Sequence, residues 1–239
     1  MSIEPVVFKK GELRQAAALQ LCWFMINGLI ILSQQFTFPD REITDFLHFL
    51  YFLSGRLLLV PLILYLGTIQ GQRSFADLGL TLKNFGQNIK LALKLSLPLL
   101  VMVMLFINLP YSLELLEGEA LNPLFTLSTP GSLTRSLLYL LPVTMITLLP
   151  ALADELLFRG FLLPLFLSRF GVYFGIILNA LYYAFIFFEF QREILIINLC
   201  VGLICAHLFY RTGSIITSTL FQALYHAIFI LYLFGFHYW

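Results

Sequence analysis

The sequence is short of charge. Only 11% of its 239 residues are charged, against roughly 25% in a soluble domain, while 60% are hydrophobic and the mean hydropathy is +0.91. So few charges cannot cover a water-facing surface, which excludes an ordinary soluble globular protein. The net charge of +1 and the lack of a Lys/Arg-rich run argue against nucleic acid as a partner. The lipid bilayer is the expected surroundings.

Patterns for metal binding and disulfides are missing too. The three cysteines lie in apolar runs, and the four histidines form no His-x-x-x-His pair. Catalytic zinc needs three protein ligands and an open position. Asp154, Glu155 and His226 are the one conceivable set, but Arg159 lies close in sequence and would repel a cation. We therefore expect no metal and no other cofactor.

Long apolar runs dominate what is present. A membrane-spanning helix needs about 20 mostly apolar residues. Runs of this kind fall near residues 15–33, 47–69, 91–110, 134–153, 155–169, 172–189, 194–210 and 214–236. The alternating pattern of a transmembrane barrel does not occur. The sequence therefore predicts an all-α, polytopic transmembrane bundle of seven or eight helices in a single domain, residues 1–239.

Basic residues predict how the bundle is oriented. They precede the first run and follow the second, whereas the stretch after the third run is acidic. The positive-inside rule then places the N-terminus, Arg169 and Arg211 on the cytoplasmic side. That orientation requires residues 134–168 to cross once, although a straight helix of that length would measure about 50 Å against a core of about 30 Å. Prolines at 142, 150 and 164 favour a single broken crossing, and two full crossings are the alternative.

The densest group of ionisable residues within an apolar stretch is Ala-Asp-Glu-Leu-Leu-Phe-Arg-Gly, residues 153–160. Ionisable side chains at membrane depth are costly and are functional candidates by default. Glu155 and Arg159 are four residues apart, so on a helix they share a face and can form an ion pair. Asp154 is offset from them by about 100° and is free to point into a cavity and take a proton from water. The alternative is a cytoplasmic helix start with acidic residues in its first turn.

Three segments carry a family resemblance. D-E-L-L-F-R-G-F-L-L-P (154–164) resembles the E-E-x-x-x-R-G signature of the CPBP family, the membrane-embedded CAAX proteases and bacteriocin-processing enzymes also called Abi proteins. Ala-Asp-Leu-Gly-Leu (76–80) and Tyr-Arg-Thr-Gly-Ser (210–214) resemble two further family segments in the same order. The resemblance covers about residues 70–230. It implies an intramembrane peptidase of a bacterial cytoplasmic membrane, in which a glutamate and a histidine activate water and a second histidine and an asparagine stabilise the oxyanion.

The first family motif is largely retained. By the resemblance its first glutamate falls on Asp154, which is one methylene shorter. The second glutamate falls on Glu155, and the arginine falls on Arg159.

The other two motifs depart from the family pattern. The F-x-x-x-H motif falls on residues 183–187, which puts Phe187 at the histidine position. The H-x-x-x-N motif falls on residues 222–226, with Gln222 for histidine and His226 for asparagine. Phe187 cannot take a proton, so general acid–base help of about 10²–10⁴-fold would be missing. Gln222 and His226 share a helix face and can both donate hydrogen bonds, as an altered oxyanion pocket would require.

Two further charged residues bear on this site. Glu189 is a candidate replacement for the missing histidine, although an ion pair with Arg192 at the helix boundary is the alternative. Arg56 interrupts a long apolar run, where it needs a partner inside the bundle. A carboxylate of the 154–155 pair is a candidate, and such pairing would argue against that carboxylate acting as a base.

Two functions follow from these observations. The favoured one is a catalytically impaired pseudoprotease that binds or scaffolds a membrane protein or peptide partner. The alternative is an active intramembrane endopeptidase that cleaves peptide or prenylated-protein C-termini, with Asp154 and Glu155 activating water. A small transporter is a third possibility, which no internal repeat supports.

Overall fold

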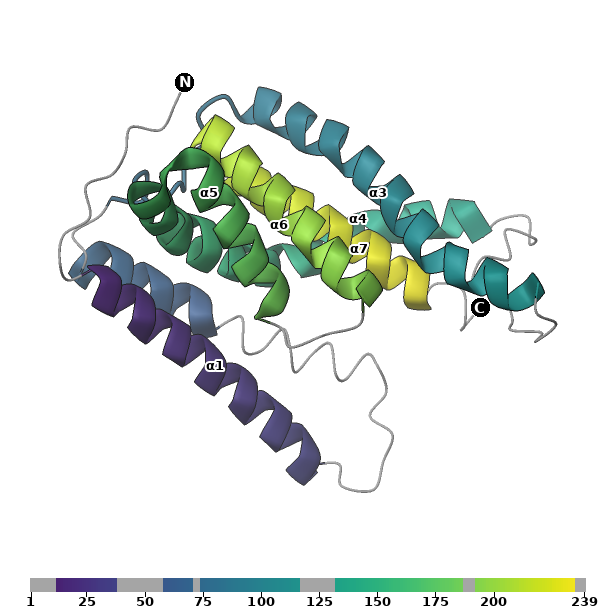
Figure 1. Ribbon diagram of the computed structural model, residues 1–239, viewed down its shortest axis with the longest axis horizontal. Coiled ribbons are helices and arrows are strands. Elements are labelled where there is room, and N and C mark those ends of the chain that lie inside the picture. The colour runs from purple at the N-terminus through teal and green to yellow at the C-terminus, as the bar shows by residue number, and fades with distance from the viewer. Residues whose placement is uncertain (1–11, 38–57, 71–73, 117–131, 187–191, 235–239) are drawn as a thin grey trace.

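A computed structural model describes residues 12–37, 58–70, 74–116, 132–186 and 192–234, and its regular elements are all helical in those ranges (Figure 1). They are α1 (Glu12–Thr37), a short α-helical stretch at residues 58–64 that runs into the π-helical η1 (Tyr65–Gln70), α3 (Phe85–Leu116), α4 (Ser132–Glu155), the π-helical η2 (Leu156–Leu162), α5 (Leu163–Phe185), α6 (Arg192–Thr212) and α7 (Ile215–Phe234). The all-α prediction is confirmed for this part of the chain. The number of helices, seven or eight, stays a prediction.

Two of the described helical stretches are long and apolar enough to cross a membrane. They are Leu140–Phe185 and Ile194–Thr212, and two shorter apolar helices are Leu58–Thr68 and Ile215–Ile228. Apolar side chains also stay exposed on the outside of the bundle, for example Leu97 and Leu141 at more than 60%. Both observations are consistent with an integral membrane protein.

Gly171 turns the chain back on itself within α5. Its backbone has φ +76° and ψ 177°, which is outside the helical region and open to glycine. The rings of Phe166 and Tyr182 lie 6.2 Å apart between centroids, although a straight helix would separate these residues by about 24 Å. Residues 163–170 and 172–185 are thus two arms of a hairpin. The predicted boundary between the runs 155–169 and 172–189 is confirmed.

The predicted boundary between 153 and 155 is wrong. The backbone of Glu155 stays helical (φ −65°, ψ −37°), and the helix widens to the π form over the next residues instead of ending. Pro164 supplies a physical reason, because it has no N–H and its ring clashes with the carbonyl four residues earlier. Asn179 from the second arm of α5 stabilises the widened turn by donating to the Phe158 carbonyl at 3.0 Å.

Helix α7 lies in the middle of the bundle, where it packs against α3, α4 and α6 (Figure 1). The Thr147 hydroxyl donates to the Ala223 carbonyl at 2.9 Å and joins α4 to α7. Helix α6 packs against α5, and the two lie close together at Gly202, where an added Cβ would be 3.0 Å from the Ala180 Cα. Helices α1, α5, α6 and α7 all contact η2, so the junction of α4 and η2 is buried.

The segment before α3, residues 74–82, contacts both the start of α7 and η2. Residues 74–82 form turns, and the Gly79 carbonyl accepts a hydrogen bond from the Ile215 backbone N–H at 2.9 Å. The Ser214 hydroxyl donates to the Thr81 carbonyl, also at 2.9 Å. On its other side the segment meets η2, since a Cβ added at Gly160 would lie 3.1 Å from the Leu78 carbonyl oxygen. The three segments that carry the family resemblance thus meet in space.

Candidate functional site

A buried ion pair lies at the centre of the bundle. Arg159 Nη1 is 2.9 Å from Glu155 Oε1, and both side chains are 0% exposed. Because the two residues lie four apart on a continuous helix, they share a face, as the sequence predicted. The side chains of Ser218 and Cys205 also lie beside the Glu155 carboxylate. The pair therefore places two neutralised charges where α4, η2, α6 and α7 meet.

Arg159 makes further contacts besides its ion pair with Glu155. Its Nη2 donates to the Gly202 carbonyl of α6 at 3.2 Å. Its guanidinium carbon lies 4.7 Å from the ring centroid of Tyr183, within the range of a cation–π contact. A planar guanidinium can make these contacts at once, whereas the ammonium of lysine cannot. Arg159 thus joins η2 to α6 and to the second arm of α5.

The Gln222 amide lies beside the Glu155–Arg159 pair and contacts the carboxylate of Asp154. Gln222 Nε2 donates to the Tyr183 hydroxyl at 3.0 Å and lies 3.5 Å from Asp154 Oδ2. All three side chains are buried, with no more than 2% exposed. Gln222, which the resemblance puts at an oxyanion-stabilising position, thus lies beside Asp154, and its role in an oxyanion pocket stays a prediction. An amide N–H can orient a carboxylate, but it does not exchange protons as an imidazole does.

His226, the second predicted oxyanion donor, lies one turn after Gln222 on α7. It is half-buried, and its ring lies 5.5 Å from that of Tyr225. Its role as an oxyanion donor near Asp154 and Glu155 stays a prediction. Phe187, Glu189 and Arg56 lie outside the residues that the structure describes, so the proposed loss of a proton acceptor at 187 rests on the sequence.

Tyr183 is the site residue that the sequence prediction missed. It is the first residue of the segment aligned with F-x-x-x-H, but only the last position of that segment entered the prediction. The signal was a hydroxyl-bearing ring deep in an apolar run, since a buried tyrosine usually needs a hydrogen-bond partner. Gly202 was missed as well, because a backbone carbonyl acceptor has no sequence signature.

Beside the Glu155–Arg159 pair the arrangement supplies a second carboxylate, Asp154, with the Gln222 amide next to it. In the part of the chain that the structure describes, no group of three or more His, Cys, Asp or Glu side chains is placed to hold a metal ion. The expected lack of a metal stays a prediction. The described chemistry consists of one buried base candidate, one amide and one phenol.

Comparison with known proteins identifies the family to which this site belongs. Residues 136–228 match the family model described as type II CAAX prenyl endopeptidase Rce1-like, which belongs to the CPBP family of membrane-embedded proteins. The match spans α4 to α7 and contains Asp154, Glu155, Arg159, Gln222 and His226. Neither the curated proteins nor the solved structures gave a match. Residues 136–228 of the chain thus carry an Rce1-like domain match of the CPBP family.

Proposed function

We propose that this protein is a catalytically impaired member of the CPBP family that binds or scaffolds a membrane protein partner. The observation that carries the proposal is the contact of Gln222 with Asp154 and Tyr183. Hydrolysis needs a base that takes a proton from water and an acid that returns one to the leaving group. The donor described beside Asp154 is the Gln222 amide, which can neither take nor return a proton, and this supports the proposal.

The geometry around Arg159 supports the same conclusion. The guanidinium contacts Glu155, the Gly202 carbonyl and the Tyr183 ring, and these contacts join three segments of the fold. A residue so engaged stabilises the bundle whether or not the chain is an enzyme. This structural role supports the proposal, because the Glu155–Arg159 pair would be retained for stability even in a chain without catalysis.

We extend the family core to about residues 70–230 on physical grounds. The Gly79 carbonyl accepts from Ile215, and the Leu78 backbone packs on Gly160, so residues 74–82 complete the packing around the site. We also place the protein in a bacterial cytoplasmic membrane with its N-terminus in the cytoplasm. The chain reversal at Gly171, directly after Arg169, is what that orientation requires.

Partner binding is tested by co-purification of the full-length protein from its native membranes. We expect one membrane protein to copurify in a constant ratio, and Asp154→Ala to retain it, because catalysis is not needed. Arg159→Ala, which breaks the packing of η2, is expected to lose the partner. Copurification that varies with preparation, or that is abolished by Asp154→Ala, would contradict a scaffolding role.

A further inference from the structure

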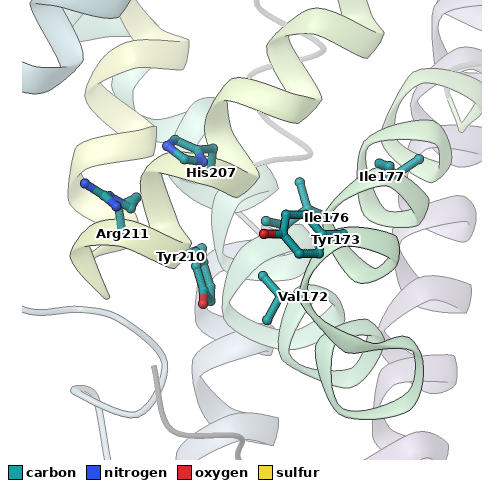
Figure 2. A pocket seen from close by; sticks show the side chains of 7 residues that line it. All are labelled: Val172, Tyr173, Ile176, Ile177, His207, Tyr210 and Arg211. Carbon is teal, nitrogen blue, oxygen red and sulfur yellow. The ribbon is translucent and has the colours of Figure 1, made fainter. Parts of the chain in front are cut away.

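A second polar site lies on the outside of the bundle, between the second arm of α5 and the last turns of α6 (Figure 2). It is a cavity of about 560 Å³. Its α5 side is formed mainly by aliphatic side chains, and its α6 side carries hydrogen-bond donors. The lining residues are Val172, Tyr173, Ile176, Ile177, His207, Tyr210 and Arg211. None of them belongs to the buried cluster around Arg159.

The cavity lies at the end of the candidate span Ile194–Thr212 and beside the chain reversal at Gly171. Arg211 is in the last turn of α6 and next to the last residue of the span Ile194–Thr212. On the other side, Val172 and Tyr173 directly follow the chain reversal at Gly171. Aromatic side chains such as Tyr173, which is 85% exposed, are typical of the headgroup level of a bilayer. Arg211 and Tyr173 thus place this cavity near the depth of lipid headgroups, with a polar side on α6 and an aliphatic side on α5.

The residues on the α6 side of the cavity favour an anion. Arg211 is an exposed guanidinium with N–H groups in a geometry that suits phosphate oxygens. The Tyr210 hydroxyl and the His207 imidazole can add further hydrogen bonds. No lining residue carries a carboxylate. The aliphatic face, Val172 and Ile176 in particular, has nothing to offer a hydrated ion but can pack against a hydrocarbon chain.

We propose that this cavity binds an anionic phospholipid, with the phosphate at Arg211, His207 and Tyr210 and an acyl chain along Val172 and Ile176. Because a polar side and an aliphatic side face each other in one cavity, the occupant is a membrane lipid and not a soluble phosphate. The site also gives the 210–214 turn a binding role, in addition to its packing against residues 74–82. It does not depend on the proposed loss of catalysis.

Native mass spectrometry of the delipidated full-length protein tests the site. The probes are phosphatidylglycerol and phosphatidylcholine with identical acyl chains, which differ in headgroup charge alone. We expect one tightly held phosphatidylglycerol per chain and weaker retention of phosphatidylcholine. Arg211→Gln should lower the affinity for phosphatidylglycerol about five-fold, as expected for one basic residue at an anionic membrane surface. Val172→Trp should lower the affinity for both lipids, because the indole ring fills the aliphatic α5 side of the cavity.

Arg192→Gln is the matched control, since Arg192 is an exposed arginine at the opposite end of the same helix. It should leave the affinity unchanged, and the thermal unfolding of all variants should match that of the unmodified chain. Equal retention of both lipids would overturn the proposal, as would equal effects of the two arginine variants. Displacement of the lipid by millimolar inorganic phosphate would also overturn it, because the site would then take a soluble anion.

Discussion

The amide of Gln222 donates to the hydroxyl of Tyr183 across the interface between α7 and the second arm of α5, with 3.0 Å between Nε2 and Oη. The same nitrogen lies 3.5 Å from the Asp154 carboxylate at the end of α4. One side chain at a position aligned with a family histidine thus links three helices. This link stabilises the bundle, and it puts an amide at the position that the resemblance gives to an oxyanion-stabilising histidine.

Removing either partner of the Gln222–Tyr183 contact should destabilise the fold. We expect Gln222→Leu and Tyr183→Phe to cost about 1–3 kcal/mol each, because each leaves a buried polar group without its partner. The double variant should cost less than the sum of the two, since the contact is lost only once. Thermal unfolding in detergent measures this cycle. Costs that simply add would show that the two side chains are not coupled.

Arg159→Met should be among the most destabilising single changes in the chain. It leaves the Glu155 carboxylate buried without its cation, and breaking a buried pair in this way costs about 3–5 kcal/mol. The double change Glu155→Leu/Arg159→Met removes both charges and should cost clearly less than Arg159→Met alone. Unfolding midpoints in denaturing detergent compare the two. A double variant less stable than the single would contradict the stated role of the pair.

Gly79→Ala should loosen the contact between residues 74–82 and the start of α7. Gly79 has φ +82°, and a Cβ there would lie 2.5 Å from Phe209 Cε2. We expect a loss of at least about 1 kcal/mol from the backbone strain alone. Gly86→Ala is the control, because Gly86 lies in α3 with nothing within 4 Å of an added Cβ. It should leave stability unchanged or raise it slightly, and the thermal midpoints of the two variants decide the matter.

Gly175→Ala should push apart the two arms of α5. An added Cβ would lie 2.9 Å from the backbone N and Cα of Leu167, and a backbone cannot move aside as a side chain can. We expect a cost of about 1–3 kcal/mol, as for other overpacked sites. Gly28→Ala in α1 meets nothing within 4 Å and serves as the control. Limited proteolysis near Gly171 would report the opening, and equal resistance in the two variants would argue against the close hairpin.

Sequence reasoning predicted the parts of this structure that depend on spacing. The Glu155–Arg159 pair follows from a separation of four residues, and the reversal near 170 follows from a break between two apolar runs. It could not place contacts that depend on how distant helices pack, such as Tyr183 with Gln222 or Arg159 with the Gly202 carbonyl. Sequence reasoning also ended a helix at residue 153, where in the structure the helix continues into η2. A π-helical widening preserves the hydrophobic run, so composition gives no sign of it.

Cleavage of a prenylated CAAX peptide by the full-length protein in proteoliposomes tests the central claim most directly. We predict that product forms no faster with the unmodified chain than with Asp154→Ala. The variant Phe187→His/Gln222→His, which restores both family histidines, provides a comparison for the same assay. Product formation by the unmodified chain that is abolished by Asp154→Ala would contradict the account and identify an active peptidase.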